Sequence, residues 1–100
     1  MMAPTPAAEK SDATKRAYRS AFLHFTGWCN STGREPLPAS VETVVTYLAS
    51  LGDSGLKSST IRKHCAAIAY AHEIKGIEPP TMDAQVRAIL RRARRREICG

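Results

Sequence analysis

Four stretches of the chain repeat apolar residues at steps of three and four, and this spacing restricts each stretch to an α-helix. The most pronounced stretch, within residues 12–32, carries both phenylalanines and the only tryptophan on one face. That face consists of Tyr18, Ala21, Phe22, Phe25, Trp28 and Cys29. Because so apolar a helix face is stable only when buried, we expect it to anchor the hydrophobic core.

Serine, glycine and proline residues mark where these helices begin and end. Ser11 or Asp12 precedes the first helix, Gly33 follows it, and Ser40 precedes the second. Helices are expected at about residues 12–32, 40–51, 58–75 and 81–96. No stretch shows the convincing alternation of a strand. The sequence therefore predicts an all-α fold, a single four-helix bundle-like domain.

The other three helices have their own apolar stripes. These stripes are Val41, Val44, Val45 and Leu48; Ile61, Cys65, Ile68 and His72; and Met82, Val86, Ile89, Leu90 and Ala93. We expect Ser58 or Ser59 to cap the third helix and Thr81 to cap the last. Asp83 would then stand in the first turn of the last helix, where the dipole favours an acid.

The formal charge of +6 and the pI of about 9.7 predict an acidic partner, either nucleic acid or an anionic membrane surface. No apolar run approaches the ~20 residues of a membrane span, and residues 1–10 lack the apolar core of a secretory signal. We expect those ten residues to be a disordered tail. Three cysteines without C-x-x-C spacing favour neither a disulfide framework nor a zinc site, which indicates a cytoplasmic protein.

The side of the third helix away from its apolar stripe is small, hydroxylated or basic. It carries Thr60, Lys63, His64, Ala67 and Ala71. A helix that approaches a large polyanion closely has this appearance. An ordinary amphipathic helix with a second, alanine-rich helix contact has it too, and the pattern leaves both interpretations open.

An arginine run closes the last helix, with five arginines between positions 91 and 96 and a single acid, Glu97, after them. Cations at a helix C-terminus offset the dipole, but this cluster exceeds what that requires. Guanidinium groups fit phosphate oxygens, so we favour phosphate contact. The alternative of a membrane-surface helix is weakened because the apolar side lacks Trp and Phe.

The sequence contains no catalytic constellation. Tyr18, Tyr47 and Tyr70 lack neighbouring activating residues and are interpreted as structural, and the three histidines as core or surface residues. No phosphate-binding glycine loop, nucleophile elbow, metal-ligand spacing or paired acids occur. We expect neither enzymatic activity nor a cofactor.

From Thr14 to Arg96 the chain resembles the N-terminal core-binding, SAM-like domain of tyrosine recombinases, the integrase family that includes Cre recombinase. The matching stretches are residues 14–29, 37–40, 44–48, 55–56, 60–64, 67–68, 71–72, 76 and 79–81, and the segment with Val86, Ile89, Leu90, Arg91 and Arg92 closes the match. The resemblance implies a helical domain that clamps duplex DNA for recombination or integration, while a separate domain cleaves the strands. Cre-like members have an additional helix before the first one, and residues 1–10 are too short for it.

Residues 11–97 would form this DNA-binding domain, with 98–100 starting a linker to a catalytic domain that this sequence does not contain. The residues implied to contact DNA are Thr14, Lys15, Arg16, Ala17, Ser20, Lys57, Ser59, Thr60, Lys63, His64, Ala67, Arg91, Arg92, Arg94 and Arg95. Replacing Ala67 with Glu would then cost DNA binding but not stability. The expected partners are double-stranded DNA and, in the full-length protein, further protomers on it; the isolated domain would be a monomer. The alternatives are a helical protein-interaction module and a stand-alone DNA-binding regulator.

Overall fold

The computed structural model describes residues 11–99, with side chains described up to residue 96. This part of the chain contains four α-helices and one short 3-10 helix, and no strand. The elements are α2 (Asp12–Thr32), α3 (Val41–Asp53), α4 (Ser58–Ile74), η1 (Pro80–Met82) and α5 (Ala84–Cys99). The predicted all-α fold is confirmed, whereas the predicted tail at residues 1–10 lies outside the described residues.

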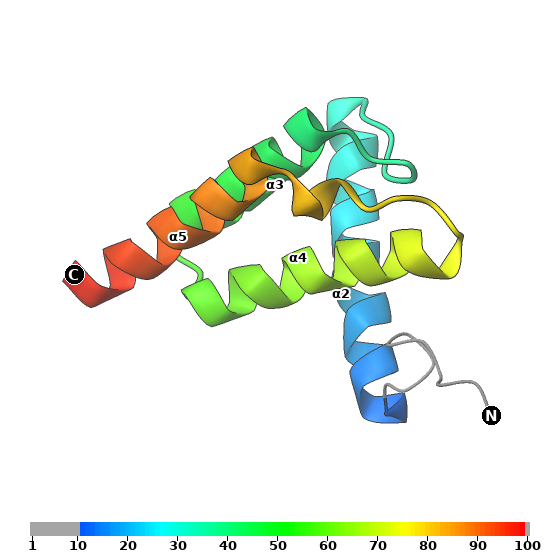
Figure 1. Ribbon diagram of the computed structural model, residues 1–100, viewed down its shortest axis with the longest axis horizontal. Coiled ribbons are helices and arrows are strands. Elements are labelled where there is room, and N and C mark those ends of the chain that lie inside the picture. Colours follow the sequence, from blue (N-terminus) through cyan, green and yellow to red (C-terminus); the bar gives the residue numbers. More distant parts are fainter. Residues whose placement is uncertain (1–10, 100) are drawn as a thin grey trace.

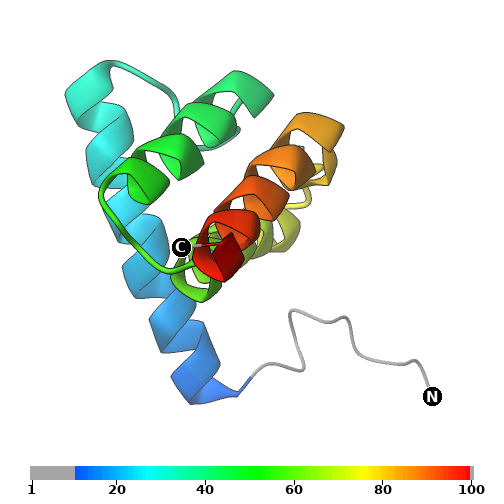
Figure 2. The same ribbon diagram turned by 90° about the vertical axis from the view of Figure 1, so that its left-hand side faces the viewer.

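The four helices form two crossing layers rather than a parallel bundle. α2 crosses α4 steeply and packs against it more extensively than any other pair of elements does (Figure 1). α3 and α5 lie side by side and run in the same direction, as both views show (Figures 1 and 2). The C-terminal end of α5 projects at one end of the molecule (Figure 1).

Two of the predicted helix starts are confirmed. The side-chain oxygens of Ser11 and Ser40 accept hydrogen bonds from the backbone amides of Thr14 and Thr43, at 3.2 and 3.1 Å. Gly33 ends α2 in the left-handed conformation, with φ 71°, and its amide bonds to the carbonyl of Cys29.

The other two predicted caps are wrong. Lys57 occupies the N-cap position of α4 without a side-chain cap bond, because the helix already begins at Ser58 and the Ser58 side chain is buried. Thr81 lies inside η1, since Pro80 starts a 3-10 turn of its own. The Asp83 carboxylate instead accepts a hydrogen bond from the Gln85 amide at 2.8 Å, so α5 starts later than predicted.

The core forms where the apolar stripes meet, and most of the predicted stripe residues are in it. Its fully buried side chains are Tyr47, Phe25, Leu48, Ile61, Ile68, His72, Val44, Val86 and Cys29. Met82 is the exception among the stripe residues, because η1 turns it outward and leaves 62% of it exposed. Tyr47 contacts the rings of Phe25 and Trp28, so the first helix does anchor the core as expected.

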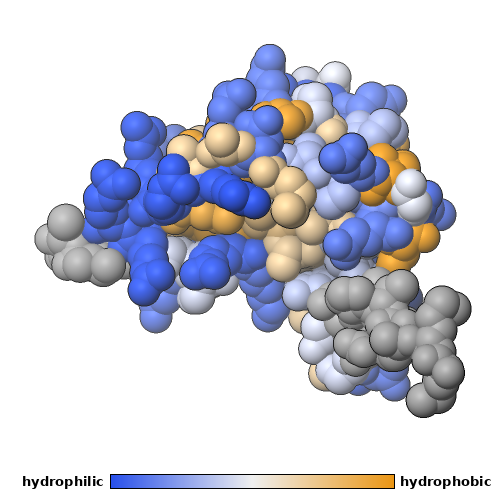
Figure 3. Space-filling model, in the orientation of Figure 1, coloured by the Kyte–Doolittle hydropathy of each residue, from blue (hydrophilic) through white to orange (hydrophobic). Residues whose placement is uncertain are grey.

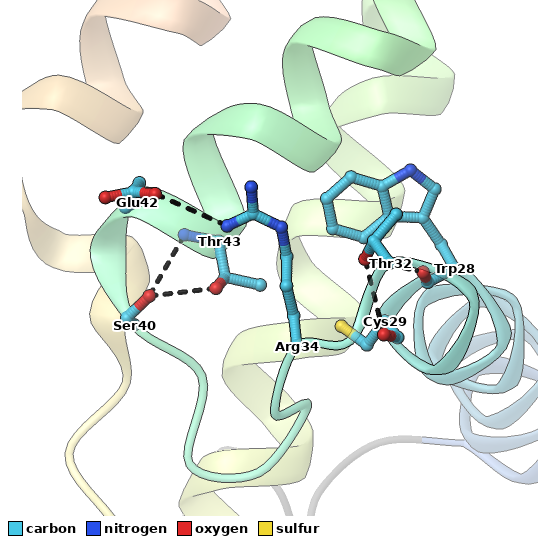
Figure 4. Close-up of polar contacts among 7 residues, drawn as sticks. All are labelled: Trp28, Cys29, Thr32, Arg34, Ser40, Glu42 and Thr43. Carbon is cyan, nitrogen blue, oxygen red and sulfur yellow. Dashed lines mark hydrogen bonds and ion pairs between the residues drawn. The ribbon is translucent and has the colours of Figure 1, made fainter.

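The loop between α2 and α3 is fastened to both helices by Arg34. Its guanidinium lies 5.6 Å from the centre of the Trp28 ring and 3.5 Å from the Glu42 carboxylate (Figure 4). Glu42 is largely exposed, so this ion pair adds at most about 1 kcal/mol. The Leu37–Pro38 peptide bond in this loop is cis.

His72 fixes the end of the same loop from inside the core. Its Nε2 accepts a hydrogen bond from the Ala39 amide at 2.9 Å, and its Nδ1 donates to the Ile68 carbonyl at 2.8 Å. An amide can only donate and a carbonyl can only accept, so the ring is neutral with its proton on Nδ1. One side chain thus joins α4 to the start of α3.

Replacing His72 with Leu is expected to lower the free energy of unfolding by about 2–3 kcal/mol. The apolar side chain fills the space but leaves the buried Ala39 amide without an acceptor. Urea unfolding measures the difference, and Lys75→Ala, an exposed change just beyond the same helix, should have almost no effect. Equal stability of all three proteins would show that this hydrogen bond does not hold the loop.

Candidate nucleic-acid interface

The corner between α2 and α4 brings together several of the residues predicted to contact DNA. Ala17, Ser20 and His24 follow one another along one face of α2, and Thr60 and His64 along one face of α4. The rings of His24 and His64 meet at the vertex, with their centres 5.4 Å apart. We call this surface the α2–α4 corner; Ser59 and Lys63 add exposed side chains to its α4 side.

Ala67 is not on this surface, and the prediction that it faces DNA is wrong. Only 1% of it is exposed, because it lies under α2 at the helix crossing, and Ala71 is buried beside it. The alanine-rich side of α4 is therefore a second helix contact, one of the two interpretations that the sequence left open. Small side chains are needed there so that the two backbones can approach.

Lys15 lies on the opposite side of α2 from Ala17 and Ser20. Together with Arg19 it flanks a shallow groove lined by Tyr18, Tyr70 and other apolar residues of α2 and α4. The Tyr18 and Tyr70 rings are 5.5 Å apart, which supports their structural interpretation. Thr14 is half-buried and its hydroxyl accepts a hydrogen bond from Ser11 at 2.9 Å, while Arg16 and Lys57 are exposed. Lys15 is therefore not part of the α2–α4 corner.

A buried tyrosine links the two histidines at the vertex. The Tyr47 hydroxyl lies 2.7 Å from Nδ1 of His24 and 3.1 Å from Nδ1 of His64, so α3 is joined to both α2 and α4. Burial raises the pKa of this hydroxyl well above its usual value, and Cys29 adds to the effect, so it remains protonated. Sequence reasoning missed this contact because the three residues are far apart in the chain.

Protonation of His64 opposes folding. Burial lowers its pKa, and the neighbouring His24 and Lys63 lower it further. The folded protein therefore binds fewer protons at this site than the unfolded chain does. The stability associated with neutral His64 is present above the unfolded pKa of about 6.5 and is lost as the pH falls toward the lower folded value.

A second basic surface lies between α4 and α5. Arg62 of α4 and Arg87, Arg91 and Arg94 of α5 line one open groove with Leu90, and we call it the arginine groove. Figure 3 shows hydrophilic residues gathered over the C-terminal half of α5. Among the described residues, none of these four arginines forms an ion pair with a carboxylate. The sequence did not indicate Arg62 as a contact residue, because it is remote from the arginine run.

The remaining arginines of the run point elsewhere. Arg92 and Arg95 are exposed outside the groove, and the Arg96 guanidinium lies over Gly52 of α3, 3.3 Å from where a Cβ would stand.

In the described part of the chain no three potential metal-ligating side chains come together. Burial raises the pKa of the Cys65 thiol to about 11, so it stays protonated. None of the described helices is long and apolar enough to cross a membrane.

Residues 7–78 match the family described as phage integrase, N-terminal SAM-like domain. The match covers most of the chain, including the crossing of α2 and α4. The chain belongs to this family. The predicted relationship to the integrase-type tyrosine recombinases is thereby confirmed, and the helical fold agrees with it.

A curated relative of this SAM-like domain is the integrase/recombinase xerD homolog of Selenomonas ruminantium. The two sequences are 36% identical over 89 residues, which include 86% of this chain but only 26% of the relative. The chain thus spans about a quarter of the length of that protein.

Proposed function

We propose that this domain binds duplex DNA as the core-binding part of a site-specific recombinase. The α2–α4 corner contacts the duplex, and the arginine groove holds its phosphate backbone. The observation that carries the proposal is the arrangement of exposed Ser20, Ser59 and Lys63 around one corner of a protein with a formal charge of +6. The name of the relative, an integrase/recombinase, supports recombination as the process served.

The mechanism we propose is binding and positioning. Lys63 and the groove arginines neutralise phosphates and release counterions, which gives affinity but little sequence preference. The short side chains of Ala17, Ser20 and Thr60 let the corner approach base edges in the major groove. We assign strand cleavage to regions of the relatives beyond the matched quarter, and propose that residues 11–97 suffice for binding as a monomer.

Replacing Lys63 with Glu is expected to weaken duplex binding about tenfold or more, since a lost phosphate contact and a new repulsion both act. Fluorescence anisotropy with duplex DNA at several salt concentrations measures the affinity. Lys63 is exposed, so thermal melts should be unchanged.

Lys75→Glu is the matched control, because it makes the same charge change at the other end of α4. It should alter affinity only through net charge. Equal effects of the two substitutions would contradict a contact at the corner. A salt-independent affinity of the unaltered domain would instead favour the protein-interaction module.

A further inference from the structure

At the vertex of the α2–α4 corner, the hydroxyl of Tyr47 forms hydrogen bonds with two histidines, and its single proton restricts how those histidines can be protonated. The Tyr47 hydroxyl, which is fully buried, is shared by Nδ1 of His24 and Nδ1 of His64. A hydroxyl carries one proton, so it can donate to only one of the two nitrogens. The other nitrogen must carry a hydrogen and donate to the hydroxyl oxygen.

The two neutral histidines are therefore opposite tautomers. The 2.7 Å contact with His24 suits an O–H donor, and the 3.1 Å contact with His64 suits an N–H donor. His24 then carries its proton on Nε2 and His64 on Nδ1. Neither Nε2 atom has a hydrogen-bond partner within the described residues. The neutral pair offers one free N–H donor.

One additional proton can enter this arrangement without breaking a hydrogen bond. If His24 becomes charged, it donates from Nδ1 to the hydroxyl, which in turn donates to Nδ1 of His64. His64 then carries its single proton on Nε2, so the pair offers two free N–H donors and one positive charge. The charge resides on the more exposed ring, where water solvates it best.

A second proton cannot enter in the same way. Both Nδ1 atoms would then donate, and the buried Tyr47 proton would lose its acceptor. The charged and titratable groups around the pair, Lys63 on α4 and Cys29 on α2, supply no replacement, since a lysine ammonium is only a donor and the buried Cys29 thiol is a weak acceptor. Lys63 also repels a second charge.

The two histidines lie where a charged imidazole could contact a DNA phosphate. Ser20 stands one turn before His24, and Thr60 one turn before His64, on the faces that we propose to contact DNA. A phosphate there would accept hydrogen bonds from both Nε2–H groups and offset the repulsion from Lys63.

We propose that His24 and His64 together form a phosphate contact that takes up a single proton when duplex DNA binds, and that the Tyr47 hydroxyl limits the pair to that one proton. This inference rests on the proposed DNA-binding function. If the inference holds, the affinity for duplex DNA depends on pH as well as on salt concentration.

Affinity for duplex DNA, measured at constant ionic strength between about pH 5.5 and pH 8, tests the proposal. Lowering the pH should tighten binding by up to about tenfold per unit, a slope of log K against pH that approaches −1 and does not reach −2. The double variant His24→Gln/His64→Gln should lose this dependence.

NMR of the imidazole nitrogens gives a second readout that needs no DNA. The free domain should show opposite tautomers at high pH, and Tyr47→Phe should abolish that distinction while a thermal melt confirms folding. Two identical tautomers, a slope near −2, or a pH dependence that survives in the double variant would each overturn the inference. Binding that weakens with salt but has the same affinity between about pH 5.5 and pH 8 also refutes the inference, while leaving the proposed function intact. Absence of binding at every pH refutes the proposed function, and the NMR titration still decides the proton limit.

Discussion

Replacing Ala67 with Glu is expected to lower the free energy of unfolding by more than about 3 kcal/mol, a large part of the 5–15 kcal/mol typical of a domain. The methyl group of Ala67 lies at the crossing of α2 and α4, with 1% of its surface exposed. A glutamate there must either push the helices apart or leave an unpaired carboxylate out of water. Urea unfolding followed by circular dichroism measures the loss.

Ala66→Glu is the matched control for this substitution. Ala66 is the preceding residue on α4 and is only half-buried, so a glutamate can reach water. Its cost should be within about 1 kcal/mol. If both variants are as stable as the unaltered domain, α2 does not pack on this side of α4. This expectation reverses the one drawn from sequence, under which Ala67→Glu would spare stability.

The double substitution Arg91→Ala/Arg94→Ala is expected to cause the largest loss of DNA affinity among variants that still fold. Both side chains are exposed and line the arginine groove with Arg62 and Arg87. If each neutralises one phosphate, the slope of log K against log salt concentration falls in magnitude by about 1.8, at about 0.9 per contact. Affinity should fall about equally on cognate and random duplexes, because phosphate contacts carry little sequence information.

The variant Arg92→Ala/Arg95→Ala removes the same charge from the same helix outside the groove. Its salt slope should change less than that of the groove variant. Equal changes would mean that the arginine run acts only through net charge. Thermal melts of both variants should match the unaltered domain, since exposed arginines at the end of α5 contribute little to stability.

The helices were predictable because their signals are local. The aromatic face of α2, the serines at positions 11 and 40, and Gly33 act within a few residues of the chain, and all of them behave as predicted. Local reasoning failed at α5, where Thr81 and Asp83 are both acceptable caps. The 3-10 turn at Pro80 decided between them, because it places Asp83 at the helix start.

The candidate site was only partly predictable. Lys63, Ser59, Arg91 and Arg94 carry charge or hydroxyl groups that are recognisable in the sequence, and the structure leaves them exposed. Arg62 joins Arg91 and Arg94 only because α4 and α5 pack together. The spacing of His24, Tyr47 and His64 in the sequence does not indicate that their side chains are in contact.

The sequence by itself determined four helices, their apolar stripes and a basic surface, because these depend on residue type and helical period. Only the tertiary structure decided what the small residues of α4 do. A helical period gives the direction of a side chain but not the neighbour it meets, so Ala67 was equally compatible with DNA and with another helix. The crossing of α2 over α4 buried Ala67 and left Lys63 exposed. The same crossing brought two histidines to one tyrosine hydroxyl.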